Sequence, residues 1–268
     1  MSQLRVLLTG PSGRVGRHLV EDYATRYDLH TFDMVPSTRP QSHLGTLQDI
    51  ASLRAAMQGV DVVLHLAATS DEAPFLEELV PNNIEGLYNL MEAAHAEGVR
   101  RVVFASSVQA VWDQLEKTGQ PLETDVLSPC SLYGVSKIFG EVLGEWYHRY
   151  RGIEFVAVRL SWFQETERVE TDAWINNVWI SPADTRLLFQ CAIEAPNVGY
   201  AIVNGTSRAP KTLLSLESAR RVLNYEPQDT PPTSAAPNGE AATKSENDSE
   251  DFVASREANA TKTLAAEV

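Results

Sequence analysis

The segment LRVLLTGPSGRVG, residues 4–16, joins a short apolar run to a glycine-rich turn. The run Leu4 to Thr9 has the length and composition of a buried β-strand, and the pattern from Arg14 to Arg26 predicts an α-helix. A glycine-rich turn between a strand and a helix is the context in which such turns bind a dinucleotide, because the diphosphate rests on the helix N-terminus. The segment therefore predicts the first strand, turn and helix of a dinucleotide-binding sheet.

The three glycines of this turn have separate expected roles. Gly10 permits a tight turn, Gly13 lets the backbone approach the diphosphate, and Gly16 lets the helix pack closely on the strand. No other residue type offers all three properties at such spacing, because each role depends on the missing side chain.

Asp33 ends the next apolar run, twenty residues after Gly13. A carboxylate there can accept both hydroxyls of the adenosine ribose and repel a 2′-phosphate, so we expect NAD, with NADP less favoured. Two observations leave alternatives open. Arg14 and Arg39 could attract a 2′-phosphate, and Asp33 could be a simple turn residue before Pro36.

Apolar runs and helical patterns alternate along most of the chain. Further strands are expected at Leu29–Asp33, Asp61–Leu66, Arg101–Ala105, Glu154–Arg159 and Tyr200–Val203. Further helices are expected at Ile50–Met57, Asn82–Glu97, Tyr133–Tyr150, Ala183–Glu194 and Leu216–Leu223. Such alternation predicts an α/β fold, a doubly wound parallel sheet of the Rossmann type with helices on both faces.

The composition changes after residue 225. Residues 1–225 are expected to form the NAD-binding domain, with small substrate-binding elements in about 160–225. Residues 226–268 are rich in Pro, Ser, Thr, Ala, Asn and Glu, and they carry almost no large apolar side chains. Such a segment cannot bury enough surface to offset its ordering entropy, so we expect a disordered acidic tail.

Charge and composition exclude several classes of partner. The net charge of -14 argues against nucleic acid, whose phosphates need clustered Lys and Arg. No apolar run is long enough to span a bilayer, so no membrane association is expected. The two cysteines, Cys130 and Cys191, show no metal-ligand spacing. We therefore expect a cytoplasmic protein without a bound metal.

Tyr133 and Lys137 stand four residues apart in LYGVSK, residues 132–137. Positions i and i+4 share one face of a helix, so a phenol and an ammonium would point into one site. A nearby cation favours the phenolate and lowers the tyrosine pKa from its reference near ~10, which makes the phenol a usable general base. The pair therefore indicates a nicotinamide-dependent enzyme that acts on an alcohol or a carbonyl.

These motifs resemble those of the extended short-chain dehydrogenase/reductase family, which includes NAD-dependent epimerases and dehydratases. The glycine turn, the strand ending near Leu66-Ala67-Ala68, Asn83, Ser106-Ser107 and the Tyr133–Lys137 pair occur in the family's order. Residues 86–90 (GLYNL), 104–107 (FASS) and 132–137 (LYGVSK) resemble compact members that oxidise sugars at C1, namely uronate dehydrogenases and archaeal NAD-dependent glucose-6-phosphate dehydrogenases. The resemblance covers about residues 4–225.

The resemblance implies a site of known chemistry. Tyr133 would take the proton from the anomeric hydroxyl as hydride leaves C1, Lys137 would lower the tyrosine pKa and bind the nicotinamide ribose, and Ser107 would position the reacting oxygen. The product would be an aldonolactone. The implied NAD contacts come from Gly10, Gly13, Arg14, Val15, Gly16, Asp33, Leu47, Leu66, Ala67, Ala68, Asn83, Tyr133 and Lys137.

The implied substrate contacts depart from those of uronate dehydrogenases. Ser70 matches a substrate-contacting serine of that group, but Val108 and Gln109 stand where it has Asn-His. The resemblance therefore implies that Gln109 contacts the substrate, together with Ser70, Ser107 and Tyr133. If Trp179 is the tryptophan that follows the group's carboxylate-binding arginine by five residues, Trp174 replaces that arginine. Trp174 could stack on a sugar.

Other positions of the resemblance bear on the cofactor and on an anionic substrate. Arg168 could bind an anionic group in place of the missing arginine. Thr46-Leu47 stands where the family has Asp-Leu or Asp-Val, so the adenine would depend on the Leu47 backbone.

The leading hypothesis is thus an NAD-dependent dehydrogenase of a sugar, sugar acid or sugar phosphate. A nucleotide-sugar epimerase or dehydratase of the same family is the alternative enzyme, although few residues remain between Arg159 and Tyr225 to hold a nucleoside diphosphate. A dinucleotide-sensing protein without activity is the alternative of another class. Family members commonly dimerise through the helix after the third strand and the helix opening at Tyr133, so the resemblance implies a homodimer.

Overall fold

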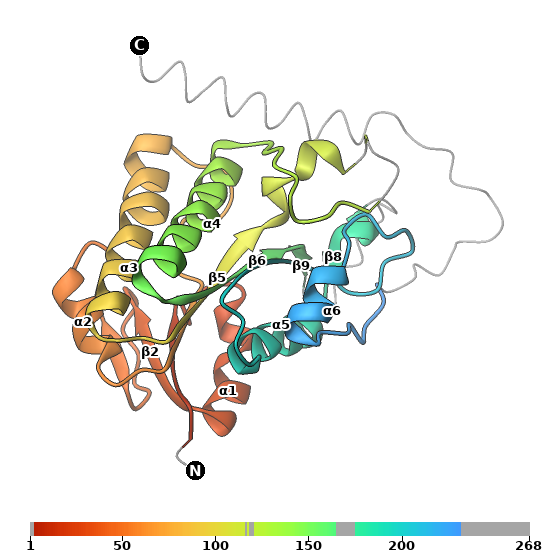
Figure 1. The fold of residues 1–268 in the computed structure, drawn as a ribbon. Coiled ribbons are helices and arrows are strands. Elements are labelled where there is room, and N and C mark those ends of the chain that lie inside the picture. The colour runs from red at the N-terminus through yellow and green to blue at the C-terminus, as the bar shows by residue number, and fades with distance from the viewer. Residues whose placement is uncertain (1–2, 116, 118–120, 165–174, 232–268) are drawn as a thin grey trace.

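The computed structural model describes residues 3–115, 117, 121–164 and 175–231. Its centre is a sheet of seven parallel strands in the order β3-β2-β1-β4-β5-β6-β9 (Figure 1). The strands are β1 (Arg5–Thr9), β2 (Asp28–Asp33), β3 (Ser42–Leu44), β4 (Val62–His65), β5 (Arg101–Ser107), β6 (Glu154–Leu160) and β9 (Tyr200–Gly205). The order reverses between β1 and β4, which is where ligands bind in doubly wound sheets.

Helices cover both faces of this sheet, as Figure 1 shows. One face carries α2 (Ile50–Met57), α3 (Gly86–Ala96) and α4 (Leu132–Arg151), and the other carries α1 (Val20–Arg26), α5 (Pro182–Glu194) and α6 (Glu217–Leu223). Strand side chains alternate between the faces, so Leu7 packs with α2 and α3 while Val6 and Leu8 pack with α1 and α5. The expected α/β doubly wound fold is confirmed.

A smaller apolar cluster lies beyond the carboxyl edge of the sheet. It joins the segment after β5 to the segment before α6, where Leu122 pairs with Leu214 in a parallel bridge. A short pair of strands, β7 (Trp162–Phe163) and β8 (Trp179–Ile180), follows β6. The sequence analysis expects small substrate-binding elements in about 160–225, and in the structure Val108, Val111, Leu115 and Leu122 pack against residues of that range.

The helix expected over Arg14–Arg26 is divided in the structure. A 3₁₀ turn, η1 (Gly16–His18), precedes α1, which begins only at Val20. The glycine turn therefore leads into a tight turn, and the regular helix starts later than its periodicity suggests, because helix ends often adopt the tighter 3₁₀ geometry.

The helix expected over Asn82–Glu97 begins earlier, with a π-helical segment η2 (Phe75–Glu85) that continues into α3. Pro81 lies inside η2. Proline has no backbone N–H to donate within a helix, and the wider π-helical winding accommodates it. The edge strand β3 was not predicted, because three residues of mixed polarity give no periodic signal.

The folded body extends past the boundary predicted at residue 225. The carboxylate of Asp184 in α5 accepts the backbone N–H groups of Gln228, at 2.7 Å, and Asp229, at 3.0 Å. These contacts could not be predicted from the composition of residues 226–231, because the carboxylate that makes them lies more than forty residues earlier in the chain. Residues 232–268, most of the segment predicted as a tail, lie outside the described residues. In the part of the chain that is described, no helix is both long and apolar enough to cross a membrane.

Candidate active site

The candidate active site lies where β5 ends and α4 begins. Ser107 is the last residue of β5, and Tyr133 and Lys137 follow in the first turns of α4. Ser131 caps this helix by accepting the N–H of Gly134 at 2.9 Å. A Cβ on Gly134 would lie 2.6 Å from the carbonyl oxygen of Gln109, so the glycine lets the helix start close against the segment after β5.

Three influences act on the pKa of the buried Tyr133 phenol. Burial raises the pKa of the Tyr133 phenol, the hydrogen bond with Ser107 lowers it, and the charge of Asp71 raises it further. The hydroxyl oxygen of Ser107 also accepts the N–H of Gln109 at 3.1 Å, which fixes its orientation. The expectation that the tyrosine pKa is lowered thus needs revision for the protein without ligands, in which burial is the largest influence.

Lys137 is buried beneath Tyr133 among aromatic rings. Its ammonium nitrogen lies 5.3 Å from the centre of the Tyr133 ring and 5.0 Å from that of Phe104. Burial lowers the pKa of Lys137 to about 8. The spacing of four residues therefore does bring phenol and ammonium together, as the sequence predicts.

A buried ion pair holds the next turn of α4 against the sheet. Glu141, four residues after Lys137, accepts two hydrogen bonds of 2.8 Å from the guanidinium of Arg159 in β6. The same carboxylate accepts the hydroxyl of Ser106 at 2.6 Å, next to Ser107. Three elements that carry the site are therefore joined by one charged network.

Asn83 connects the segment after β4 with α4. Its side-chain oxygen accepts the N–H of Thr69 at 2.9 Å, and its amide donates to the hydroxyl of Ser136 at 3.0 Å. Ser136 in turn donates to the carbonyl oxygen of Tyr133 at 2.7 Å. Asn83 is thus placed to steady the helix start that carries the tyrosine.

The glycine turn forms a cradle that side chains would fill. Gly10 has φ +72°, and a Cβ there would lie 2.8 Å from the nitrogen of Ala67. A Cβ on Gly16 would lie 2.2 Å from the carbonyl oxygen of Gly10. Gly13 is exposed at the open side of the turn. These three positions fit a dinucleotide diphosphate, because the turn stays narrow and its outer side remains accessible.

Hydrogen bonds from Thr9 connect the glycine turn to β4 and to the segment that follows it. The hydroxyl of Thr9 accepts the N–H of Ala67 at 3.3 Å and hydrogen-bonds to His65 at 2.8 Å. Burial, and then the charge of Lys137, lower the pKa of His65 to about 3, so its ring is neutral. Leu66 donates its N–H to the carbonyl oxygen of Thr9, and Ala68 follows in the same half-buried segment.

Asp33 reaches back to the glycine turn. One carboxylate oxygen accepts the N–H and the hydroxyl of Ser12, at 3.0 and 2.7 Å. Arg14 and Arg39, which could have attracted the 2′-phosphate of NADP, have partners within the protein. Arg39 pairs with Glu21 at 2.8 Å, and Arg14 donates to the carbonyl oxygen of Phe163. This arrangement favours a ribose with free hydroxyls over one with a 2′-phosphate.

Two further cofactor positions of the resemblance lie at the edge of the site. The backbone carbonyl of Leu47 accepts the side-chain amide of Asn89 at 3.1 Å, and the Leu47 side chain is buried against Gly86. Val15 is half-buried just before η1. The Leu47 carbonyl is therefore already engaged, and its N–H is the backbone group left to contact an adenine.

Gln109 lies at the mouth of the site with both ends of its amide engaged. Its nitrogen donates to Asp71 at 2.9 Å, and its oxygen accepts the hydroxyl of Ser131 at 2.6 Å. Ser70, which precedes Asp71 in the chain, is exposed. Trp174 and Arg168, the two other substrate positions, lie outside the described residues.

Several residues of the site were not foreseen in the sequence. Glu72 accepts the backbone N–H of Tyr133 at 3.1 Å, and Asp71 acts on its phenol. Both acids lie in a segment without periodicity, which gives no signal. Glu141 could have been found from the sequence, because it continues the spacing of four residues from Tyr133 and Lys137 on α4.

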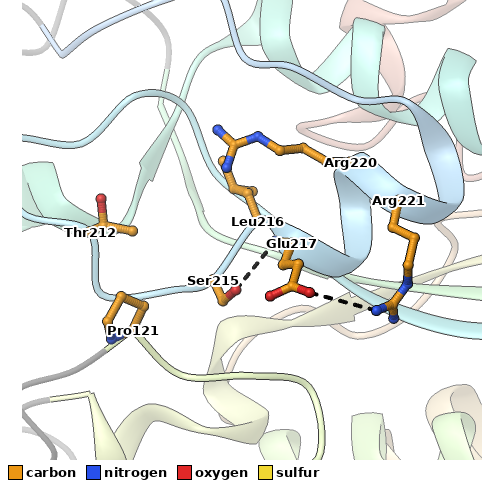
Figure 2. A pocket seen from close by; sticks show the side chains of 7 residues that line it. All are labelled: Pro121, Thr212, Ser215, Leu216, Glu217, Arg220 and Arg221. Atoms are coloured by element: carbon orange, nitrogen blue, oxygen red, sulfur yellow. Dashed lines mark hydrogen bonds and ion pairs between the residues drawn. The ribbon is translucent and has the colours of Figure 1, made fainter.

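A separate hollow of about 630 Å³ lies beside α6 (Figure 2). Its lining residues are Pro121, Thr212, Ser215, Leu216, Glu217, Arg220 and Arg221. Arg221 pairs with Glu217 at 3.8 Å inside it, and Arg220 pairs with Glu226 at 2.6 Å. The lining includes none of the side chains that form the candidate active site. Among the described residues, no cluster of three or more His, Cys, Asp or Glu forms a metal site.

Comparisons with known proteins agree with this geometry. Residues 6–163 match the NAD dependent epimerase/dehydratase family. The NAD-dependent glucose-6-phosphate dehydrogenase of Haloferax volcanii is 34% identical over 245 residues, which cover 84% of this chain and 93% of that protein. The L-arabinose 1-dehydrogenase (NAD(P)(+)) of the same organism is 31% identical and covers 85% and 98%.

A solved structure gives the same result in three dimensions. The uronate dehydrogenase of Agrobacterium tumefaciens superimposes with a TM-score of 0.75 at 30% identity, covering 88% of this chain and 93% of that one. Fold, glycine cradle, Ser107–Tyr133–Lys137 site and sequence relatives thus point the same way, and the resemblance found in the sequence is confirmed: the chain belongs to the NAD-dependent epimerase/dehydratase family.

Proposed function

We propose that this protein is an NAD-dependent dehydrogenase that oxidises a sugar, sugar acid or sugar phosphate at C1 and releases a lactone. The observation that carries the proposal is the arrangement of Ser107, Tyr133 and Lys137 at the carboxyl edge of the sheet, beside the glycine cradle. Two relatives that match along most of both chains are sugar dehydrogenases. The epimerase alternative is weaker for that reason.

The residues of the cradle would hold NAD. Gly10, Gly13 and Gly16 would admit the diphosphate, Asp33 the adenosine ribose, and Lys137 the nicotinamide ribose. Bound NAD supplies the acceptor for the hydride that leaves C1.

Tyr133 handles the proton of the reacting hydroxyl. In oxidation the phenolic oxygen takes this proton while the C–H bond breaks with both electrons and the C=O bond forms. Burial keeps the phenol protonated in the protein alone, so the phenolate must be stabilised when the reaction begins. The hydroxyl of Ser107 and the nearby cation of Lys137 supply that stabilisation.

The outer face of α4 supports a homodimer. Val135, Val142, Trp146 and Tyr150 form one stripe along this helix, and each is at least 43% exposed. Tyr88 on the neighbouring α3 is exposed as well. A stripe of this size on one helix face is a natural surface for a second copy of the chain, which would bury it in a four-helix contact.

The redox chemistry and the cysteines fit the cytoplasm, where the protein would meet NAD. Cys130 and Cys191 lie in the described chain and form no disulfide with each other.

The test is NADH formation with purified protein, NAD and a panel of aldoses, uronates and sugar phosphates. We expect turnover with at least one of these classes and a loss of about a thousandfold in kcat for Tyr133→Phe, with little change in NAD affinity. Tyr27→Phe, which removes a phenol that bonds to Glu194 outside the site and the proposed dimer surface, is the matched control and should keep full activity. A protein that binds NAD but turns over no member of the panel, or a fully active Tyr133→Phe variant, would contradict the proposal.

A further inference from the structure

We infer that Asp71 determines the substrate class of this site and that its carboxylate selects a neutral aldose over a uronate or a sugar phosphate. The inference rests on the proposed function and specifies its substrate. It starts from Gln109, a buried side chain that the sequence suggested as a direct substrate contact.

The amide of Gln109 is oriented by the N-terminus of α4. Ser131 donates its hydroxyl to the amide oxygen at 2.6 Å, so the opposite end of the amide must be the donor. That donor reaches one carboxylate oxygen of Asp71 at 2.9 Å. Gln109 therefore acts on substrate through Asp71 and is a positioning residue.

The backbone also holds the Asp71 carboxylate in place. Asp71 has φ +70°, a left-handed conformation that is uncommon for residues other than glycine, asparagine and aspartate. The N–H of Glu72 donates at 3.0 Å to the oxygen that Gln109 contacts. Within the described part of the chain, both hydrogen bonds fall on this oxygen, and the second oxygen of the exposed carboxylate accepts none.

The negative charge of Asp71 acts on the phenol of Tyr133 and raises its pKa. Glu72 adds a second carboxylate at the start of α4, bonded to the backbone of Tyr133. Among the described residues, the nearby cations are occupied, since Arg159 is paired with Glu141 and Lys137 lies buried under the phenol ring. The described residues at the mouth of the site therefore give it a negative potential.

A negative potential at the entrance of the site favours neutral sugars over anionic ones. An ionised carboxylate only accepts hydrogen bonds, and sugar hydroxyls can donate to it. A substrate carboxylate or phosphate has no proton to donate and is repelled by the like charge. The second oxygen of Asp71 thus matches a hydroxyl of a neutral aldose.

The experiment compares kcat/KM for arabinose, glucose and galactose with kcat/KM for glucuronate, galacturonate and glucose 6-phosphate, using the full chain with NAD. We expect the wild-type protein to favour a neutral aldose. Asp71→Asn should lower kcat/KM for that aldose about tenfold, mainly through KM, and raise the anionic-to-neutral ratio by about tenfold or more. Asparagine tolerates the left-handed backbone, so this variant should fold.

Two further variants test the reasoning. Gln109→Leu removes the donor that orients Asp71 and should shift the ratio in the same direction by a smaller factor. Glu77→Gln, which removes one exposed charge from the following helix, should leave the ratio unchanged. NAD affinity should match the wild type in all three, and the unfolding midpoints of Asp71→Asn and Glu77→Gln should match it as well. Gln109→Leu should lower the midpoint, because the hydroxyl of Ser131 loses its buried acceptor.

The outcomes separate the two proposals. A wild-type preference for anionic sugars, or a ratio that Asp71→Asn leaves unchanged, would overturn the role of Asp71 while the dehydrogenase proposal stands. Absence of turnover with every sugar would overturn the proposed function itself. A shift equally large in Glu77→Gln would show a general effect of surface charge and would also overturn the role of Asp71.

Discussion

The guanidinium of Arg159 and the carboxylate of Glu141 face each other in the protein interior, joined by two parallel hydrogen bonds of 2.8 Å. Their side chains are 0% and 2% exposed. The pair links strand β6 to helix α4 one turn below Lys137, and the hydroxyl of Ser106 extends the link to β5. The positions of the three proposed catalytic residues therefore depend on one buried ion pair.

Glu141→Gln should destabilise the protein by about 3 kcal/mol, because it leaves the buried charge of Arg159 uncompensated. Urea unfolding monitored by tryptophan fluorescence measures this loss. Glu145→Gln is the matched control: it breaks an exposed pair with Arg149 on the same helix and should cost less than about 1 kcal/mol. Equal losses in the two variants would show that the buried pair has no special importance.

The stability of the protein without NAD should rise with pH because of Lys137. Burial lowers its pKa from 10.5 to about 8, so between these values the unfolded chain still binds a proton that the folded protein has released. The free energy of unfolding therefore increases with pH across this window, by about 3 kcal/mol in total. Unfolding curves between about pH 7.5 and 10.5 measure the increase.

Comparison with Lys137→Met isolates this contribution, since other groups titrate equally in both proteins. The variant should lack the increase, whereas Lys211→Met, which removes an exposed lysine, should keep it. Parallel pH profiles for the wild type and Lys137→Met would contradict the burial argument.

Gly16→Ala should weaken NAD binding by at least about tenfold, since the added Cβ would lie 2.2 Å from the carbonyl oxygen of Gly10 and force the turn open. Isothermal titration calorimetry gives the affinity. The control is Gly98→Ala, at φ +74° with open space around it, which should cost about 1 kcal/mol of stability but no affinity. Unchanged NAD binding by Gly16→Ala would show that the glycine turn does not bind the cofactor.

Asp33→Asn should move cofactor preference toward NADP, by about tenfold or more in the ratio of kcat/KM values, because the charge that repels a 2′-phosphate is lost. Asparagine keeps an acceptor for the N–H of Ser12, so the turn should stay intact. Steady-state kinetics with both cofactors measure the ratio. A ratio that stays the same would mean that Asp33 serves the turn alone.

Trp146→Glu should convert the proposed homodimer into monomers, because it places a charge in the apolar stripe of α4. Light scattering coupled to size-exclusion chromatography measures the mass. Leu127→Glu changes an even more exposed apolar residue outside α4 and should leave the mass unchanged. A wild-type protein that is monomeric at micromolar concentration would contradict the dimer.

Much of the fold could be predicted from the sequence because its signals are local. Buried parallel strands are continuous apolar runs, so β1, β4 and β5 stand out, and the spacing of Tyr133 and Lys137 fixes their shared helix face. The glycine turn was correctly placed between a strand and the start of a helical segment.

The remainder depends on contacts between distant segments. The π-helical η2 passes through Pro81, a residue that usually ends a helix, so its periodicity was hidden. Gln109 was predicted to contact substrate, yet its amide is engaged by Asp71 and Ser131, which precede and follow it by more than twenty residues. The pKa of Tyr133 was predicted from its neighbour alone, whereas burial is a property of the whole fold.

The helix α4 presents Tyr133 and Lys137 to the chemistry on one side and Val142 and Trp146 to solvent on the other. Each residue added to a helix turns everything after it by about 100°, so a single insertion between Lys137 and Val142 would turn the exposed stripe away from its position opposite the Tyr133–Lys137 pair. The spacing between the two sets along α4 therefore couples the site to the proposed dimer surface. Asp71 lies outside this helix, so a substitution there can change the sugars that are accepted while Tyr133 and Lys137 keep their places on α4.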